Sequence, residues 1–433
     1  MTRMRAPHEK NKHFVEWTLF ILVAVLSFNG AWIFNGHDTH AFLRDAYDGL
    51  GYYQWLPGNL VEHRIDWMYW CYKIAPDRAI SLFTLGVACL ELPFFLVSQW
   101  LTWLFEYPND GFSPPNAVAM MLSASVYAGA GAVLAFKLAR RFSTEESALL
   151  AVLVLFASTN LFYYCTREPL MSHVYSFFLI ALFCWCGLRV IDGPRPVHVF
   201  AFILSGALVV LVRQVNVFTF IFPLWMAVSS PGGLRGMFKN LGGHRLALGL
   251  GILAALVPWI LQMMYWYHMT GAIYANGYAL KGEYFEWDKM VPGLLLFGPR
   301  NGWLVYSPLL IVPMIMLFVH AWRKTLPARP ILLIVMLTVL IYSAWWCWWM
   351  GGSYGHRAMV DLYALMAIPL AWFFRSVFQR SWATRIAIAL FLIACIRLNI
   401  ELMVPWRSGW GDAGWTWPQL MEQIGAIAGG WNP

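Results

Sequence analysis

The segment Asn116–Phe136 reads NAVAMMLSASVYAGAGAVLAF and contains no charged side chain. As a helix rising about 1.5 Å per residue, it is long enough to cross the hydrocarbon core of a bilayer, which is about 30 Å thick. Comparable apolar runs occur along the whole chain. The clearest are Trp17–Phe34, Ser147–Tyr164, Leu170–Leu188, Leu246–His268, Trp303–Trp322, Ile331–Met350 and Ala358–Phe374, and weaker ones are Val197–Val212, Val215–Ser229 and Ala383–Ile396.

The composition agrees with a chain that lies in a membrane. Hydrophobic residues make up 60% of the 433 residues and charged residues 12%, whereas a soluble domain carries roughly 25% charged residues. The formal charge of +8 comes without the basic, aromatic face that binds nucleic acid. We predict an all-α polytopic membrane protein. A soluble enzyme, a disordered protein and a disulfide-rich secreted domain are excluded.

The distribution of Lys and Arg predicts how the chain is threaded, because short cytoplasmic loops are enriched in these residues. The apolar stretch Ala79–Phe105 decides the outcome, and it carries Glu91 and Pro93. If this stretch crosses the membrane, most basic loops fall outside. If it lies along the outer face, they fall inside together with the N-terminus and its Arg3 and Arg5. We therefore expect it not to cross, and we predict about eleven transmembrane helices with the N-terminus inside and the C-terminus outside.

The region Val197–Ser229 is expected to form two spans. A single helix of this length would be about 50 Å long, more than the core can hold, and Arg213 interrupts its middle. Two long outer segments, residues 35–115 and 269–302, are rich in Trp and Tyr, which suit the membrane–water interface. We expect a single transmembrane domain over residues 1–433, with outer juxtamembrane helices and no sizeable soluble C-terminal domain. Any chemistry is then expected at the outer face.

The first outer segment contains the acids best suited to catalysis. Asp45 and Asp48 are three residues apart, which places them on one face of a helix. A carboxylate at the membrane surface can act as a general base toward a hydroxyl, although an ordinary solvated loop acid would have the same spacing. The aromatic residues that follow, and that could line a substrate pocket, are Tyr52 and Tyr53.

Two further polar groups flank the predicted spans. His37, Asp38 and His40 could bind a metal, but this short spacing is weak evidence. Glu168 precedes an apolar run and His173 lies just inside it. Ionisable residues within a membrane are functional candidates by default, whereas the alternative here is a capped helix end with a hydrogen-bonded histidine.

Basic residues and glycines at the outer ends of later spans could surround an anion. The turn Gly351–Arg357 reads GGSYGHR, and its backbone N–H groups and guanidinium are suited to a phosphate. Each arginine could alternatively reach the lipid headgroups as a surface side chain. The residues expected to bind phosphate are Arg357, Arg300, Lys281 and Arg213, and those expected to line the pocket beside them are Asn301, Ser353, His356 and Trp348.

Four of these motifs, in order, resemble the GT-C superfamily of integral membrane glycosyltransferases. The closer similarity is to family 39-like enzymes, which include protein O-mannosyltransferases and lipid A aminoarabinose transferases. The matching stretches are DGLGYY from Asp48, PLMSH from Pro169, RNG from Arg300, where the family usually has His in place of Asn, and WWMGGSYGHR from Trp348.

The resemblance implies a GT-C-like fold in a bacterial inner membrane, with the active site on the periplasmic face. It implies a sugar donor on a polyprenyl phosphate and a glycan, lipid or protein acceptor, with Asp48 as the general base and Asp45 as the alternative. The acceptor hydroxyl would attack in a single inverting displacement while basic residues stabilise the leaving phosphate. No metal or other cofactor is needed in this scheme.

Two other functions share the predicted spans. A transporter or flippase of lipid-linked sugar would need polar residues near the midplane of several helices, whereas the charges here cluster at the outer ends. A non-catalytic scaffold of the cell envelope would give Asp48 and Arg357 no role.

Overall fold

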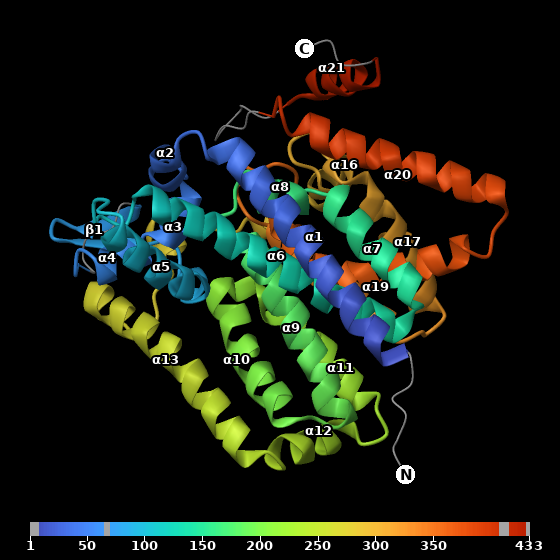
Figure 1. The fold of residues 1–433 in the computed structure, drawn as a ribbon, viewed down its shortest axis with the longest axis horizontal. Helices are drawn as coiled ribbons and strands as arrows, with labels where there is room; N and C mark the ends of the chain where they lie inside the picture. The colour runs from blue at the N-terminus through green and yellow to red at the C-terminus, as the bar shows by residue number, and fades with distance from the viewer. Residues whose placement is uncertain (1–7, 65–69, 407–414, 430–433) are drawn as a thin grey trace.

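Helices packed side by side make up most of the computed structural model in Figure 1, which describes residues 8–64, 70–406 and 415–429. Arg3 and Arg5, used above for orientation, lie outside the described residues. The long helices are α1 (His8–Asn35), α5 (Gly86–Leu104), α6 (Pro114–Phe142), α9 (Ser172–Asp192), α10 (Pro196–Val212), α13 (Arg245–Thr270), α18 (Ala328–Ser343), α19 (Tyr363–Val377) and α20 (Trp382–Leu402).

Helix α6 is at the centre of the bundle, where it contacts α1, α5, α9 and α19. Its small residues make this close packing possible. A Cβ added at Gly129 would come within 2.8 Å of the Phe20 carbonyl oxygen of α1, and one at Gly131 within 2.6 Å of the Phe177 ring of α9. In lipid there is no hydrophobic driving force between helices, so they associate largely by close van der Waals packing. Small residues at such positions let the helix backbones approach closely enough for it.

Seven helices in the described residues are long and apolar enough to cross a membrane, or eight if one bent pair counts as a span. Three shorter apolar helices, Pro196–Val212, Pro308–Trp322 and Ala328–Ser343, fall below that length. The chain is therefore a helical membrane protein, while the expected count of about eleven spans is not confirmed. Helix α5 belongs to the seven, so its expected position along the outer face stays a prediction.

Several expected spans are interrupted, because polar side chains at the breaks hydrogen-bond to distant segments. Ser147–Tyr164 divides into α7 (Glu145–Ala157) and α8 (Leu161–Thr166). At the break, Asn160 donates to the Tyr354 carbonyl at 3.0 Å and accepts from the Tyr363 hydroxyl at 2.6 Å. The region Trp303–Trp322 contains α16 (Trp303–Tyr306), η3 (Pro308–Leu310) and α17 (Ile311–Trp322).

Two further breaks concern the candidate site. As expected, the region around Arg213 is broken, with α10 ending at Val212 and η1 (Gln214–Phe220) leading into α11 (Ile221–Val228). The expected span Ile331–Met350 is wrong at its end, because α18 stops at Ser343. The following tryptophans form turns, where the Trp346 N–H donates to the Tyr284 carbonyl at 3.2 Å.

One element corrects the all-α expectation. Strands β1 (Cys71–Ala75) and β2 (Arg78–Ser81) pair antiparallel as a hairpin, with Tyr72 opposite Ile80. The turn is Pro76-Asp77, and Pro and Asp favour turns because of the fixed φ of the former and the local hydrogen bonding of the latter. Apart from the long helix α5, the other elements of residues 35–115 and 269–302 are short helices: α2 (Thr39–Arg44), α3 (Asp48–Tyr53), α4 (Trp55–Leu60), α14 (Gly277–Leu280), η2 (Trp287–Lys289) and α15 (Pro292–Phe297).

The C-terminal region adds one helix that the sequence did not predict. Helix α21 (Trp417–Ala428) buries Leu420 and Ile427 and is held to α20 by Arg397, which donates to the Ile427 carbonyl at 2.7 Å. Figure 1 shows α20 and α21 on the opposite side of the bundle from the start of α1.

Candidate functional site

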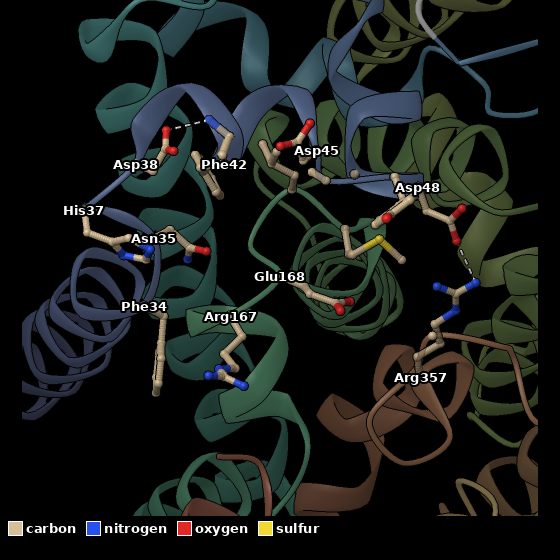
Figure 2. Close-up of a pocket in the computed structure, with 17 residues that line it drawn as sticks. Phe34, Asn35, His37, Asp38, Phe42, Asp45, Asp48, Arg167, Glu168 and Arg357 are labelled. Carbon is tan, nitrogen blue, oxygen red and sulfur yellow. Dashed lines mark hydrogen bonds and ion pairs between the residues drawn. The ribbon is translucent and has the colours of Figure 1, made fainter. Parts of the chain in front are cut away.

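A cavity of about 670 Å³ lies where α1, α2, α3, the α8–α9 connection and the turn before α19 meet. Its lining includes Asp45 and Asp48 from the first outer segment, Glu168 from the connection, and Gly352 and Arg357 from the turn. Figure 2 shows Asp48 joined to Arg357, with Glu168 beside this pair. Residues from three of the four family-like motifs thus line one cavity, although they are far apart in the sequence.

An ion pair between Asp48 and Arg357 forms one wall of this cavity. Asp48 Oδ2 lies 2.7 Å from Arg357 Nη2, and the two side chains are only 15% and 13% exposed. A guanidinium presents five N–H groups, so one contact with a carboxylate leaves most of the fork able to bind a second anion. Arg357 can therefore hold the Asp48 carboxylate and a second oxyanion next to each other.

Glycines place Asp48 where it can meet its partner. Helix α3 begins at Asp48, after Tyr47 with φ of +46°, and rests on the start of the α9 segment. A Cβ at Gly49 would lie 2.9 Å from the Leu170 side chain, and one at Gly51 2.2 Å from the Phe83 ring. Glycine at 49 thus lets α3 approach the α8–α9 connection, and glycine at 51 lets it pack on Phe83 within its own segment.

The Gly-rich turn that carries Arg357 is fixed from several sides. Ser353 Oγ accepts from the Arg357 N–H at 3.3 Å and shares a 3.2 Å hydrogen bond with the Tyr164 hydroxyl. Asn301 donates to the Trp349 carbonyl at 2.7 Å, which ties the RNG motif to the turn. His356 Nε2 donates to the Trp348 carbonyl at 2.9 Å. Burial lowers the pKa of His356 to about 3, so this histidine is neutral.

Glu168 is the second acid of the cavity. The Tyr163 hydroxyl donates to its Oε1 at 3.0 Å. Burial raises the pKa of Glu168 to about 7, and the positive charge of Arg357 opposes this shift. Glu168 therefore changes between its neutral and charged forms near neutral pH, whereas the sequence pattern alone identified it only as a candidate pocket residue.

A second, buried polar cluster lies behind the cavity. Asp361 is 1% exposed, and its two oxygens lie 2.8 Å from His173 Nδ1 and 3.2 Å from Arg213 Nε. Arg213 also donates to the Tyr342 hydroxyl at 2.7 Å and to Ser172 Oγ at 3.3 Å. The sequence pattern indicates His173 and Arg213 as candidates but does not indicate Asp361. A lone acid within an otherwise apolar span was the available signal, because such residues are rare and functional in membranes.

Tyr52 connects the two groups of charges. Its hydroxyl is hydrogen-bonded to Ser172, and the charges of Arg213, Asp48 and Arg357 all act on it. Burial is the largest influence, and it raises the pKa of Tyr52 above its ordinary value. The hydroxyl thus remains neutral and lies between the cavity pair and the buried cluster.

The remaining candidates are placed differently. Asp45 is an exposed lining residue of the cavity. The Tyr53 hydroxyl donates to the Gly111 carbonyl, within the packing of α3 on its neighbours. Lys281 pairs with Glu283 at 2.7 Å, and the Arg300 guanidinium lies over the Trp349 ring at 5.7 Å. Neither basic residue contributes to the cavity lining.

The possible metal ligands of the first outer segment are also accounted for. Asp38 caps α2 by accepting from the Ala41 N–H at 2.9 Å, and His37 and Asp38 are exposed at the edge of the cavity. Among the residues that the structure describes, no three His, Cys, Asp or Glu side chains are arranged to hold a metal ion.

Comparisons with known proteins find similar solved structures, among them two of an oligosaccharyltransferase. No family model and no curated protein matches the chain. The archaeal oligosaccharyltransferase AglB from Archaeoglobus fulgidus, in complex with an inhibitory peptide and a dolichol-phosphate, is 11% identical over 93% of this chain, with a TM-score of 0.49. The apo form of the Archaeoglobus fulgidus oligosaccharyltransferase is 11% identical over 92% of this chain, with a TM-score of 0.48. This chain covers 57% of the length of each.

Proposed function

We propose that this protein is a glycosyltransferase that moves a sugar from a polyprenyl-phosphate donor to a hydroxyl acceptor at the outer face of the membrane. The observation that carries the proposal is the 2.7 Å ion pair of Asp48 and Arg357 on the wall of a cavity that also contains Glu168. This arrangement supplies a proton acceptor and an anion-binding group side by side.

Asp48 is the general base of the proposed reaction. Arg357 engages Oδ2, while Oδ1 accepts the proton of the acceptor hydroxyl as that oxygen attacks the anomeric carbon. The bond from the anomeric carbon to the phosphate oxygen breaks with its electron pair on the phosphate. One carboxylate is enough for this single inverting displacement, because the leaving phosphate requires no proton.

Arg357 is the principal ligand of the donor phosphate. Its position in a Gly-rich turn lets backbone N–H groups and the guanidinium act on the same anion. Arg213 adds positive charge from behind Tyr52, and Glu168 accepts hydrogen bonds from sugar or acceptor hydroxyls. Charge that develops on the phosphate is stabilised by groups already in place, which is the most effective form of transition-state stabilisation.

The position of the charges favours an enzyme over a transporter. Ser172 and His173 start α9, Arg213 follows the last residue of α10, and Asp361 belongs to η4 (Arg357–Leu362), which leads into α19. These polar residues are therefore all at helix ends, on the side of the bundle that holds the cavity. A transport pathway would need them along the helix midpoints.

Donor turnover tests the proposal. Purified protein in nanodiscs would be given a labelled polyprenyl-phosphate sugar and envelope extract as the acceptor source, and release of polyprenyl phosphate would be measured. We expect release with the natural protein and almost none with Asp48→Asn. Equal release by both proteins, or transfer of donor across a vesicle membrane without release, would overturn the enzymatic assignment.

The side of the membrane has its own test. A cysteine at position 109 should react with an impermeant reagent added outside, and one at position 141 should react only when the reagent reaches the inside. The opposite pattern would place the cavity on the cytoplasmic side.

A further inference from the structure

Helix α12 (Gly233–Gly242) is oriented unlike its neighbours. It follows α11 after a short break and is bent from it by 104°. Helix α13 then starts at Arg245 and runs back along the bundle. Figure 1 shows α12 across the lower edge of the molecule, beneath the ends of α9, α10 and α11. If α11 and α13 cross the membrane, α12 lies close to the plane of its surface.

Three different stripes run along α12. Met237 and Leu241 are buried against the bundle. Leu234 and Phe238, four residues apart on the adjoining face, are 38% and 63% exposed. Arg235 and Lys239 are also exposed. Residues four apart share one face of a helix, so an exposed apolar stripe lies between the buried stripe and an exposed basic stripe.

Hydrogen bonds fix α12 in this position. Asn240 donates to the Val190 carbonyl at 2.8 Å, near the end of α9. His244, at the start of the next helix, lies 3.1 Å from the Pro194 carbonyl. These bonds fix the orientation of α12 on the bundle, so the helix cannot rotate to bury the exposed ring of Phe238.

The charge around α12 is almost entirely positive. Arg189 lies in the last turn of α9, Arg195 caps the start of α10, and Arg245 is the first residue of α13. The nearby acid Asp192 pairs with Arg141 at 3.1 Å. In the part of the chain that the structure describes, no carboxylate comes within ion-pair distance of Arg235, Lys239 or Arg245. These exposed cations are therefore available to an external anion.

We propose that α12 lies in the membrane–water interface and binds anionic lipid headgroups. Phe238 and Leu234 would enter the acyl region while Arg235 and Lys239 reach the phosphates, as in helices that lie in the plane of a bilayer. The proposal does not depend on the glycosyltransferase function, because it concerns a different end of the bundle.

The test compares lipid retention by the full-length protein. Wild type and Arg235→Gln/Lys239→Gln would be taken from nanodiscs of equal parts phosphatidylcholine and phosphatidylglycerol, and bound lipids would be counted by native mass spectrometry. Each cation near an anionic surface is worth about fivefold in affinity. We therefore expect the variant to lose about 25-fold in preference for phosphatidylglycerol. High salt should reduce the wild-type preference in the same direction.

A matched variant separates α12 from a general effect of positive charge. Arg323→Gln/Lys324→Gln removes the same two charges at another exposed turn, beside the 89% exposed Trp322, and should retain the wild-type preference. Thermal unfolding of both variants in detergent should match wild type, since all four side chains are exposed. An unchanged preference in the α12 variant, or an equal loss in the matched variant, would overturn the proposal.

Discussion

The short helix η4 carries two ion pairs that serve different purposes. At its start, Arg357 pairs with Asp48 on the cavity wall, where both side chains retain 13–15% exposure. Four residues later, Asp361, which is 1% exposed, pairs with Arg213, which is 15% exposed and has further partners in Tyr342 and Ser172. The first guanidinium lines the cavity and can bind another anion, whereas the second is not among the lining residues and donates to two protein hydroxyls. Similar residues thus give a reactive pair and a structural one, and access to the cavity makes the difference.

Removal of the proposed base should have the largest effect. Asp48→Asn cannot accept the acceptor proton, and general-base catalysis is worth about 10²–10⁴-fold. We expect a loss of that size in transfer rate, with donor binding close to wild type. Asp45→Asn, at an exposed position on the same cavity, is the control and should retain most activity. If Asp45→Asn were the more damaging change, Asp45 would be the base.

The buried pair should respond in stability instead. Asp361→Asn leaves Arg213 charged without its partner inside the protein, which costs about 3–5 kcal/mol when a buried pair is broken. We expect a clear drop in the thermal midpoint in detergent. The double variant Asp361→Asn/Arg213→Gln removes both charges and should recover part of the loss. No recovery would show that Asp361 acts through His173 rather than through Arg213.

Donor affinity should separate Arg357 from the other candidate cations. A charge-assisted hydrogen bond is worth roughly 1.5–3 kcal/mol, so Arg357→Ala should lose one to two decades of polyprenyl-phosphate affinity. Arg357→Lys should also be impaired, because an ammonium lacks the planar fork. Lys281→Ala, which removes a cation paired with Glu283 away from the cavity, should bind as wild type does. Titration calorimetry in detergent would give these affinities.

The smallest effect concerns pH. The pKa of Glu168 is raised to about 7 in the folded protein, so the folded state holds this proton more tightly than the unfolded chain does. Stability should therefore be highest below about pH 4.5 as far as this group is concerned, and should fall by about 1–3 kcal/mol as pH rises to about 7. Glu168→Gln should lack this fall. The thermal midpoints of both proteins would be measured at pH 5 and pH 8. Between these two pH values, the midpoint of the wild type should fall relative to that of Glu168→Gln.

The sequence predicted the parts of this structure that depend on local pattern. Long apolar runs predicted the principal helices, and the length of the run Val197–Ser229 together with Arg213 in its middle predicted the break there. The motifs indicated Asp48 and Arg357, the start of an apolar run indicated Glu168, and the structure brings the three to one cavity. The predicted roles of these residues stay predictions.

What could not be predicted depends on contacts between distant segments. The break at Asn160 forms because its amide hydrogen-bonds to Tyr354 and Tyr363, which no local pattern reveals. Asp361 looked like part of an apolar span until His173 and Arg213 were placed beside it. Lys281 and Arg300 were grouped with Arg357 by expected depth alone, and depth does not fix the direction in which a side chain points.

The distance along the chain between Asp48 and Arg357 has a consequence for biosynthesis. At about 5–20 residues per second, roughly 15–60 s pass between synthesis of the carboxylate and synthesis of its guanidinium partner. During that interval the first outer segment has been synthesised, but Asp48 has no Arg357 to pair with. The cavity is therefore among the last features to assemble, and a nascent chain interrupted before the Gly-rich turn would contain most of the helices but not the paired wall.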